Sequence, residues 1–299
     1  MSKVLITGVG GFTGRYLAAR LAGAGYEVHG TMHGEDGPTV AAVANLHPLD
    51  VGDAQAVNAL IAELSPAKVV HLAAIAFVAH SNVAEMYRTN VVGTRNLLDA
   101  LASTSTPPDA VLLASSANVY GNARAGTLDE SIPPAPANDY GVTKAAAEMI
   151  ATIYAKRLPL IVVRPFNYTG RGQSEQFLIP KIVSHARRRA PEIELGNLDV
   201  ARDFSDVRGI VDAYARLLEM PHAIGGTFNI CSGHATALSE VIELVSRISG
   251  HEFAVRVNPS FVRADEVKTL CGSAAKVEGV IGPLAMPPFE ETLRWMLED

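Results

Sequence analysis

Short apolar runs alternate with longer segments of helical period over the first 164 residues, and this alternation limits most strongly how the chain can fold. It is typical of β-α units, in which parallel strands form one sheet. The expected strands are apolar over most of their length, as strands covered by helices on both faces should be. They are residues 3–7, 27–31, 44–48, 68–72, 111–115 and 160–164. The expected helices are residues 14–22, 54–63, 91–101 and 144–157.

The regular alternation ends after residue 164, where a second part of the chain begins. Residues 167–172 are predicted as a loop, and residues 174–189 as a helix outside the repeating pattern. Residues 207–219 and 226–231 resemble another helix and strand of the first sheet, so we expect the chain to return there. A helix over 238–249 and the stretch 255–299 complete the second part. The predicted fold class is α/β, a Rossmann-type doubly wound parallel sheet with a smaller, interleaved α+β lobe.

Composition argues against several classes of protein. A formal net charge of −6 with 19% charged residues describes a mildly acidic chain, so we expect no nucleic-acid partner. No apolar run approaches the roughly 18 residues of a spanning helix, and the first apolar stretch is too short for a signal peptide. We therefore expect a cytoplasmic protein with no membrane partner. The 9 histidines and 2 cysteines show no metal-ligand spacing, so no metal site is expected.

A glycine-rich turn follows the first expected strand. Residues 7–14 read T-G-V-G-G-F-T-G, which gives the spacing T-G-x-x-G-x-x-G between a strand and a helix. Gly8 permits the tight turn, and Gly11 lets backbone N–H groups approach a pyrophosphate at the helix N-terminus. Gly14 lets the helix press on the sheet. The pattern predicts that this end of the sheet binds a dinucleotide.

The sequence leaves the choice between NAD and NADP open. The second expected strand runs into H-G-T-M-H at residues 29–33, with no acidic residue where an NAD enzyme usually binds the ribose 2′-hydroxyl. His33 is the nearest candidate to meet a 2′-phosphate, so the sequence favours NADP(H), with NAD(H) as the alternative. Asp50 is predicted to accept a hydrogen bond from the adenine amino group or to cap the next helix, a role that Asp53 fills at least as well.

Tyr140 and Lys144 form a candidate acid–base pair. Four residues apart on a helix, they share one face, so the ammonium group can lie near the phenol and favour its ionised form. A tyrosine with its ordinary pKa of about 10 is a poor acid–base group at neutral pH. The spacing Y-x-x-x-K also occurs by chance as a surface pair, so the interpretation depends on the motifs around it.

Those motifs follow one another in a fixed order along nearly the whole chain. Besides the glycine turn they are V-H-L-A-A at 70–74, N-V-V-G-T at 90–94 and S-S-A-N-V-Y-G at 115–121. Together with Tyr140 and Lys144 they resemble the extended short-chain dehydrogenases/reductases, the NAD-dependent epimerase/dehydratase family. The resemblance implies that Ser116 hydrogen-bonds the substrate oxygen, that Tyr140 exchanges its proton and that Lys144 also binds the nicotinamide ribose.

Two further expectations come from this resemblance. Ser115 competes with Ser116 for the catalytic role, and we choose Ser116 because it lies three residues before Val119, as in the family. The cofactor contacts implied by the motifs are Gly8, Gly11, Phe12, Thr13, Gly14, His33, Asp50, Val51, Leu72, Ala73, Ala74, Tyr140, Lys144 and Phe166.

The segment R-P-F-N-Y-T-G-R-G-Q at residues 164–173 narrows the expected substrate. It is similar to the R-P-F-N-x-x-G-P-G-Q stretch of GDP-mannose dehydratases and GDP-4-keto-6-deoxymannose reductases, with Arg171 in place of proline. This likeness implies that Asn167 contacts a nucleotide sugar, unless it serves only as a turn residue. Arg202 and Arg263 lie in segments that resemble the same group's substrate lobe, where guanidinium groups suit phosphate oxygens. Arg263 alternatively pairs with a neighbouring carboxylate.

The resemblance thus implies a division into a dinucleotide-binding domain at residues 1–166 and 205–231 and a nucleotide-sugar-binding lobe at residues 167–204 and 232–299. The same group of enzymes commonly dimerises through two helices per subunit, so we expect a homodimer formed by the helices at 91–101 and 144–157. The substrate implied is a GDP-sugar.

Asn118 decides between the reactions of this group. Dehydratases place a carboxylate there to remove the C5 proton, and an amide cannot act as that base. GDP-fucose synthases place a cysteine there for epimerisation. The sequence therefore favours NAD(P)H-dependent reduction of the C4 ketone of a GDP-4-keto-6-deoxyhexose, with Asn118 among the substrate contacts. The main alternative is a nucleotide-sugar 4-epimerase with retained NAD. The sequence favours a 4,6-dehydratase or a non-catalytic dinucleotide-binding protein less.

Overall fold

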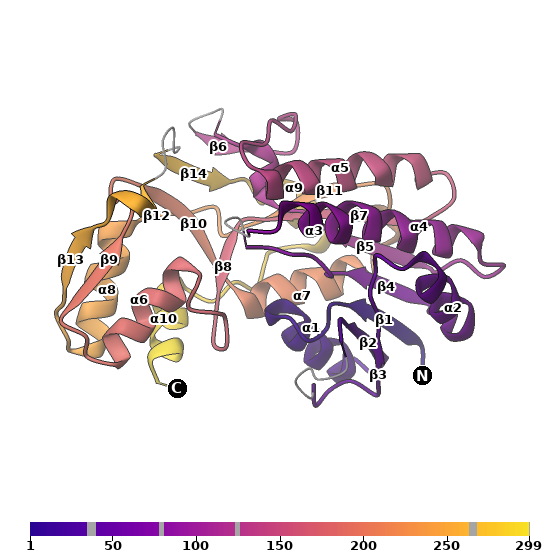
Figure 1. Ribbon diagram of the computed structural model, residues 1–299, viewed down its shortest axis with the longest axis horizontal. Coiled ribbons are helices and arrows are strands. Elements are labelled where there is room, and N and C mark those ends of the chain that lie inside the picture. Colours follow the sequence, from indigo (N-terminus) through magenta and orange to yellow (C-terminus); the bar gives the residue numbers. More distant parts are fainter. Residues whose placement is uncertain (35–39, 78–80, 123–125, 263–267, 299) are drawn as a thin grey trace.

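The computed structural model describes residues 1–34, 40–77, 81–122, 126–262 and 268–298. Its central sheet has seven parallel strands in the order β11-β7-β5-β4-β1-β2-β3 (Figure 1). These strands are β1 (Lys3–Thr7), β2 (Glu27–Met32), β3 (Asn45–Pro48), β4 (Lys68–His71), β5 (Ala110–Ala114), β7 (Leu160–Pro165) and β11 (Thr227–Ile230). The strand order reverses between β1 and β4, where open α/β sheets bind ligands at the carboxyl ends of the strands.

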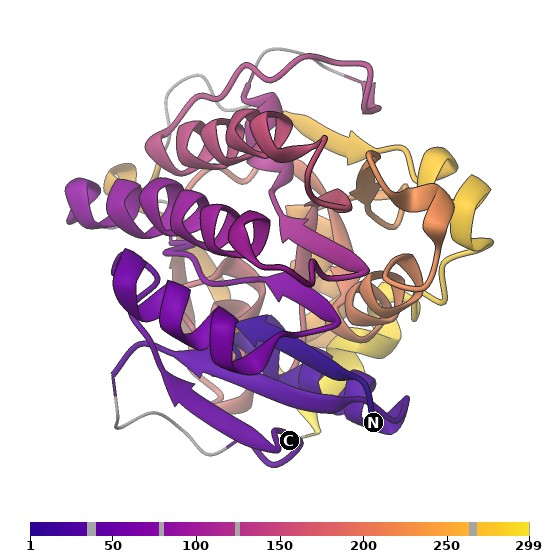
Figure 2. The ribbon, with the colours of Figure 1, turned by 90° about the vertical axis from the view of Figure 1, so that its right-hand side faces the viewer.

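Helices cover both faces of this sheet, which confirms the predicted doubly wound α/β fold (Figure 2). One face carries α1 (Phe12–Gly23), α7 (Val207–Leu217) and α9 (Ala275–Ile281), and the other carries α2 (Ala54–Leu64), α4 (Gly93–Ser103) and α5 (Asp139–Tyr154). The inner strands are largely apolar because they are packed between the two helix layers, whereas the edge strand β3 is mostly exposed. β7, for example, is buried along its whole length.

The predicted smaller lobe is present and lies beyond the carboxyl ends of the central strands (Figure 1). Its larger sheet contains β6 (Thr127–Leu128), β8 (Asn167–Thr169), β10 (Ala201–Asp206), β12 (Ala235–Ala237) and β14 (Thr269–Gly272). A second sheet pairs β9 (Glu192–Leu195) with β13 (Ala254–Val257). The helices α6 (Leu178–Arg187), α8 (Leu238–Ser249) and α10 (Phe289–Leu297) share one apolar cluster.

Two helices near the site begin at positions other than those predicted. The helix expected at 144–157 begins at Asp139, because the side chain of Asn138 caps it by accepting a hydrogen bond from Gly141 N–H at 2.8 Å. The helix expected at 91–101 begins at Gly93 and follows α3 (Val83–Tyr87) and one π-helical turn, η1 (Arg88–Val92). The expected helix at 174–189 is shortened to α6.

The second part of the chain also contributes to the first apolar core. Val277 and Ile281 of α9 are buried in the same cluster as α1 and α7. We therefore propose a domain division in which α9 joins the residues predicted to bind the dinucleotide, while the rest of the predicted division is kept. Within the described ranges, no helix has both the length and the apolar character needed to cross a membrane.

Candidate active site

The glycine turn has the shape that a dinucleotide diphosphate needs. Gly8 has a φ of +71°, and a Cβ there would lie 2.8 Å from the backbone of Ala73. A Cβ on Gly14 would lie 2.5 Å from the carbonyl oxygen of Val9. Gly11 is the N-cap of α1 and has no side chain, so it leaves the first N–H groups of α1 without a side-chain cap from that position. The residues present therefore fit a bound diphosphate.

The loop after β4 lies directly beside this turn. Leu72 N–H donates to the Thr7 carbonyl at 3.2 Å, and Ala73 N–H donates to Thr7 Oγ1 at 3.1 Å. The predicted cofactor residues Leu72, Ala73 and Ala74 are thus brought to the glycine turn, all of them half-buried. Their roles as cofactor contacts stay predictions.

Phe12 and Thr13, at the start of α1, contact the smaller lobe through Tyr168 of β8. The Phe12 and Tyr168 rings stack with centroids 6.1 Å apart, and the Thr13 hydroxyl lies 2.7 Å from the Tyr168 hydroxyl. Phe166 is buried against Tyr120 with ring centroids 6.2 Å apart. These contacts bring the lobe against the glycine turn.

Asp50 is engaged by groups that the sequence did not single out. Its Oδ1 accepts from Gly52 N–H at 2.8 Å, and its Oδ2 accepts from Arg88 Nη2 at 2.5 Å. The Arg88 hydrogen bond, and the nearby His33, help to hold the pKa of Asp50 below its usual value against the effect of burial. Asp53 caps α2 through Gln55 and Ala56 N–H, as expected. Arg88 thus places a positive charge, and His33 an imidazole ring, near Asp50.

Val51, the next predicted cofactor residue, is buried beneath the N-terminal end of α4. Its carbonyl accepts from Asn96 Nδ2 at 3.0 Å, and a Cβ on Gly93 would lie 2.5 Å from its side chain. The short distance shows why a glycine opens α4.

Ser116, Tyr140 and Lys144 are brought together at the carboxyl end of β5, and all three are buried. Lys144 Nζ lies 5.9 Å from the centroid of the Tyr140 ring and donates to the Ala114 carbonyl at 2.7 Å. Ser116 hydrogen-bonds the Tyr140 hydroxyl, and this contact lowers the pKa of Tyr140. The arrangement gives a proton donor, a hydrogen-bonding hydroxyl and a cation within one site.

The expected depression of the Tyr140 pKa by Lys144 is not found. Burial raises the pKa of Tyr140 well above 10 and outweighs the hydrogen bond from Ser116. Burial also lowers the pKa of Lys144 to about 8, although Glu148 opposes the shift. A tertiary property, the loss of water around both groups, therefore decides the sign that helix spacing alone suggested.

Ser115, the competing serine, points to a different set of groups. Its hydroxyl donates to Glu148 Oε1, and Glu148 receives two hydrogen bonds from Arg164, at 2.9 and 2.7 Å. Arg164 also donates to the Tyr120 hydroxyl at 3.0 Å. Ser115 thus belongs to a buried ionic network behind Lys144, whereas Ser116 faces Tyr140.

His71, at the end of β4, is buried between two threonines. The Thr94 hydroxyl donates to the Asn90 carbonyl at 2.6 Å, so it accepts from His71 Nε2–H at 3.0 Å. His71 Nδ1 then accepts from the Thr7 hydroxyl at 2.7 Å. Burial, reinforced by Lys144, lowers the pKa of His71 to about 3, so the ring is neutral in the folded protein.

This histidine makes stability depend on pH. Between pH 6.5 and about 3 the unfolded chain binds a proton that folded His71 does not, so the free energy of unfolding falls as pH decreases through this range. The contribution has a slope of up to about 1.4 kcal/mol per pH unit. We expect urea unfolding at pH 4 to 7 to show a smaller slope for His71→Gln than for the wild type. The exposed control His222→Gln should retain the wild-type slope, and equal slopes for all three proteins would contradict the assignment.

The predicted substrate residues fall into three settings. Asn118 lies beside Ser116, with its backbone N–H and its Nδ2 each 3.1 Å from Ser116 Oγ. Asn167 is exposed on β8, and Arg202 on the neighbouring β10 is half-buried and donates to the Ala201 carbonyl at 2.8 Å. Arg263 lies outside the described residues. The substrate roles of all four stay predictions.

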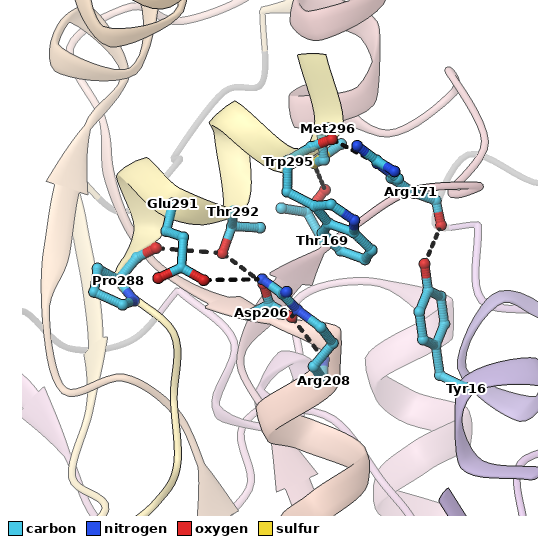
Figure 3. A network of polar contacts seen from close by, with 10 residues as sticks. All are labelled: Tyr16, Thr169, Arg171, Asp206, Arg208, Pro288, Glu291, Thr292, Trp295 and Met296. Carbon is cyan, nitrogen blue, oxygen red and sulfur yellow. Dashed lines mark hydrogen bonds and ion pairs between the residues drawn. The ribbon is translucent and has the colours of Figure 1, made fainter. Parts of the chain in front are cut away.

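Arg171, the departure from the family segment, joins the C-terminal helix to the first domain (Figure 3). Its Nε donates to the Trp295 carbonyl at 2.5 Å, and its carbonyl accepts from the Tyr16 hydroxyl at 2.8 Å. The Trp295 ring lies between two guanidinium groups, 5.2 Å from that of Arg171 and 4.2 Å from that of Arg208. A proline at position 171 could make none of these side-chain contacts.

Asp206 anchors the other side of this junction. It caps α7 through Arg208 N–H, binds the Arg208 guanidinium through both oxygens and accepts from the Thr292 hydroxyl of α10 at 2.6 Å (Figure 3). The start of α7 and the C-terminal helix are therefore fixed to each other by a buried carboxylate. Among the described side chains, no group of three or more histidine, cysteine, aspartate or glutamate residues could hold a metal ion.

Sequence reasoning missed three polar residues of the site and included a fourth, Asn90, only as part of the motif at 90–94. Asn138 could have been found as a helix N-cap, since it immediately precedes the acidic first turn of α5. Glu148 could have been found too, because it follows Lys144 by four residues and therefore lies on the same face of the helix. Arg88 contacts Asp50, and Asn90 contacts Ile75. These partners are distant in the sequence, so no local sequence pattern predicts the contacts.

Comparison with known proteins identifies relatives along the whole chain. The family model described as GDP-mannose 4,6 dehydratase matches residues 5–296. The GDP-6-deoxy-D-talose 4-dehydrogenase of Aggregatibacter actinomycetemcomitans is 34% identical, over 94% of this chain and 91% of the relative. The GDP-6-deoxy-D-mannose reductase of Pseudomonas aeruginosa strain PAO1 is 32% identical, over 99% and 96%.

Two solved structures share both the fold and substantial sequence identity. A crystal structure from Burkholderia cenocepacia J2315, which carries the provisional description of an epimerase, is 51% identical with a TM-score of 0.94, covering 99% of this chain and 97% of that one. The RMD protein of Pseudomonas aeruginosa complexed with NADPH is 31% identical with a TM-score of 0.86, covering 100% and 98%.

Proposed function

We propose that this protein reduces the C4 ketone of a GDP-4-keto-6-deoxyhexose. The premise is its family: the chain belongs to the GDP-mannose 4,6 dehydratase family, within the NAD-dependent epimerases/dehydratases of the extended short-chain dehydrogenase type. The observation that carries the proposal is the grouping of Ser116, Tyr140 and Lys144 with an amide, Asn118, beside the serine. Relatives named as a GDP-6-deoxy-D-talose 4-dehydrogenase and a GDP-6-deoxy-D-mannose reductase support the substrate class. The product would be GDP-rhamnose or its C4 epimer, GDP-6-deoxytalose.

The side chains divide the work of carbonyl reduction. A bound nicotinamide dinucleotide supplies the hydride when present. Ser116 and Tyr140 hydrogen-bond the ketone oxygen, and Tyr140 transfers its proton to that oxygen as negative charge develops there. The cation of Lys144, 5.9 Å from the centroid of the Tyr140 ring, would offset part of the cost that burial imposes on the resulting tyrosinate. Reduction needs no carbanion at C5, so the amide of Asn118 is compatible with this reaction and does not provide the base that dehydration requires.

The glycine turn and the end of β2 would hold the dinucleotide, which we propose to be NADP(H) by preference. Arg88 supplies a positive charge and His33 an imidazole ring near Asp50, where a ribose 2′-phosphate would need a partner. We expect Arg88→Ala to raise KM for NADPH by about tenfold and KM for NADH by less than about twofold. Steady-state kinetics with both cofactors test this. An equal rise for both, or none for NADPH, would contradict the preference. Arg95→Ala, at an exposed arginine of α4, is the control.

The direct test of the function is turnover of a defined substrate. Purified protein is incubated with GDP-4-keto-6-deoxymannose and either NADPH or NADH, cofactor absorbance is followed and the product is identified by NMR. We expect oxidation of the reduced cofactor in proportion to the GDP-6-deoxyhexose formed. Absence of oxidation with both cofactors would rule out the proposal.

A nucleotide-sugar 4-epimerase is the second candidate, because the 51% identical structure carries the provisional description of an epimerase. An epimerase needs the same three catalytic side chains but keeps its NAD between turnovers. The cofactor content of the purified protein separates the two functions. An epimerase is purified with NAD bound and interconverts two sugars without added reductant. The reductase should turn over only when reduced cofactor is supplied.

We also propose a homodimer, supported by apolar side chains on the outer surface of α5. Met149 is 65% exposed and Ile153 is 70% exposed, and Val142 on the same helix and Val92 before α4 are exposed as well. Such a patch is typical of an interface. We expect Met149→Glu/Ile153→Glu to shift the protein from dimer to monomer in light scattering. Ile224→Glu, at an exposed apolar residue elsewhere, is the control, and a monomeric wild type would contradict the dimer.

A further inference from the structure

Two asparagines lie behind Ser116 and connect it to the start of the catalytic helix. Asn138 Nδ2 lies 3.4 Å from Asn118 Oδ1, and Asn118 Nδ2 lies 3.1 Å from Ser116 Oγ. We propose that Asn138 and Asn118 are positioning residues that fix the direction of the hydrogen bonds at Ser116, so that Ser116 always donates toward the reacting oxygen. This inference deepens the proposed carbonyl reduction and rests on it.

The direction of this chain is set at a backbone group. Gly141 N–H can only donate, and it donates to Asn138 Oδ1 at 2.8 Å. The oxygen of the Asn138 amide is therefore held at the N-terminus of α5, and its NH2 group must point the other way, toward Asn118. Capping of α5 thus has a second effect: it removes the freedom of the Asn138 amide to flip.

The orientation of Asn138 determines that of Asn118. Because Asn138 presents N–H to Asn118, the Asn118 amide turns its oxygen toward Asn138 and its own NH2 group toward Ser116. Ser116 Oγ then accepts two hydrogen bonds, from the backbone N–H and from the Nδ2 of Asn118, both at 3.1 Å. A hydroxyl has two lone pairs and one proton, so both acceptor sites of Ser116 are filled.

With its lone pairs occupied, Ser116 can act only as a donor. Without substrate its one proton is directed to the Tyr140 hydroxyl, and this contact lowers the pKa of Tyr140. When a ketone is bound, the same proton is donated to the ketone oxygen instead. Tyr140 in turn cannot give its proton to Ser116, because no lone pair is left there to accept it. The Tyr140 proton is therefore directed to the substrate oxygen, which is the transfer that ketone reduction needs.

Other ionisable groups also face Tyr140, and the test must separate their effects. They are Lys144 on the same helix, Tyr168 of β8 and Tyr214 of α7. Neutral substitutions at Asn118 and Asn138 leave these groups and their charges in place. A change in the pH profile of such a variant therefore reports on the hydrogen bonds at Ser116.

Asn138→Ser is the sharpest variant, because serine is as good an N-cap as asparagine but lacks the NH2 group. We expect the midpoint of thermal unfolding to change little, kcat to fall by about five- to tenfold and the KM values to stay within about twofold. In the direction of alcohol oxidation, the acidic limb of the kcat profile should move to higher pH, because Tyr140 loses part of the hydrogen bond that favours its ionised form.

Asn118→Leu and Asn82→Ser provide the second variant and the control. Asn118→Leu removes the amide that contacts Ser116 and should shift the profile in the same direction as Asn138→Ser. Asn82 is the N-cap of α3 and accepts from Glu85 N–H at 3.1 Å, so Asn82→Ser is the same substitution at another cap. Asn82→Ser should leave kcat and the pH profile unchanged. If Asn138→Ser also leaves both kcat and the pH profile unchanged, as Asn82→Ser should, the proposed positioning role of Asn138 is wrong.

A spectroscopic readout tests the inference without a substrate. In protein labelled with [ζ-13C]tyrosine, the Tyr140 resonance is identified by its absence in Tyr140→Phe. We expect this resonance to shift in Asn138→Ser and Asn118→Leu, and not in Asn82→Ser. A shift without any turnover of GDP-4-keto-6-deoxymannose by the wild type would reject the proposed function and keep the hydrogen-bond direction. Turnover by the wild type with no shift in either variant would support the proposed function and reject the hydrogen-bond direction.

Discussion

Tyr140→Phe is expected to lower kcat by about 10³-fold while KM for the dinucleotide stays within about twofold. Phenylalanine keeps the ring, which is buried at the start of α5, and removes only the hydroxyl that Ser116 contacts. Carbonyl reduction then has no proton donor at the substrate oxygen. Stopped assays of NADPH oxidation with a GDP-4-keto-6-deoxyhexose measure the loss.

The matched control for this prediction is Tyr87→Phe. The Tyr87 hydroxyl donates to Asp139 Oδ1 at 3.1 Å near the N-terminus of the same helix, but outside the catalytic group. Its removal should leave kcat unchanged. If Tyr140→Phe turned over substrate as fast as the wild type, Tyr140 would not be the proton donor. Absence of turnover by both proteins would favour the alternative of a non-catalytic dinucleotide-binding protein.

The largest expected loss of stability comes from the buried ion pair behind Lys144. Arg164→Met should lower the free energy of unfolding by about 3 to 5 kcal/mol, because Glu148 is left as a buried charge without its partner. In the wild type, Arg164 Nη2 and Glu148 Oε2 lie 2.7 Å apart, and both side chains are almost entirely buried. Urea unfolding followed by circular dichroism measures the difference.

A double variant separates loss of the pair from loss of packing. Glu148→Leu/Arg164→Met removes both charges and should recover most of the stability, since an apolar pair of similar volume often replaces a buried ion pair without cost. Arg95→Met breaks the exposed pair with Asp99 and should change stability by less than about 1 kcal/mol. A double variant as unstable as Arg164→Met would contradict the role of the unpaired charge.

The sheet was predictable because its inner strands are short apolar runs, a pattern that can be read directly from the sequence. All seven central strands begin and end within one residue of their expected limits, including β11, which was expected at 226–231. The helix limits near the site were less accurate. The start of α5 depends on a single side-chain cap, Asn138, and the start of α4 follows a π-helical turn held by Asn90.

The candidate site could be predicted where its residues share one local pattern. The glycine turn and the pair Tyr140 and Lys144 are of this kind, since strand-to-helix spacing and one helix turn bring them into place. The pairs Arg88 with Asp50 and Arg164 with Glu148 join different elements, so spacing along the chain does not reveal them. The direction of the Tyr140 pKa was wrongly predicted for the same reason, because burial is a property of the whole fold.

The junction around the C-terminal helix gives the protein a built-in optical probe. Trp295 is the single tryptophan of the chain, so fluorescence excited selectively in its indole ring comes from one known place. That ring lies between the guanidinium groups of Arg171 and Arg208 and meets the edge of Tyr16 on α1 (Figure 3). Because α1 begins at the glycine turn, a ligand that moves this helix changes the surroundings of the fluorophore. Titrations with a dinucleotide or a nucleotide sugar can therefore be followed on the unlabelled protein.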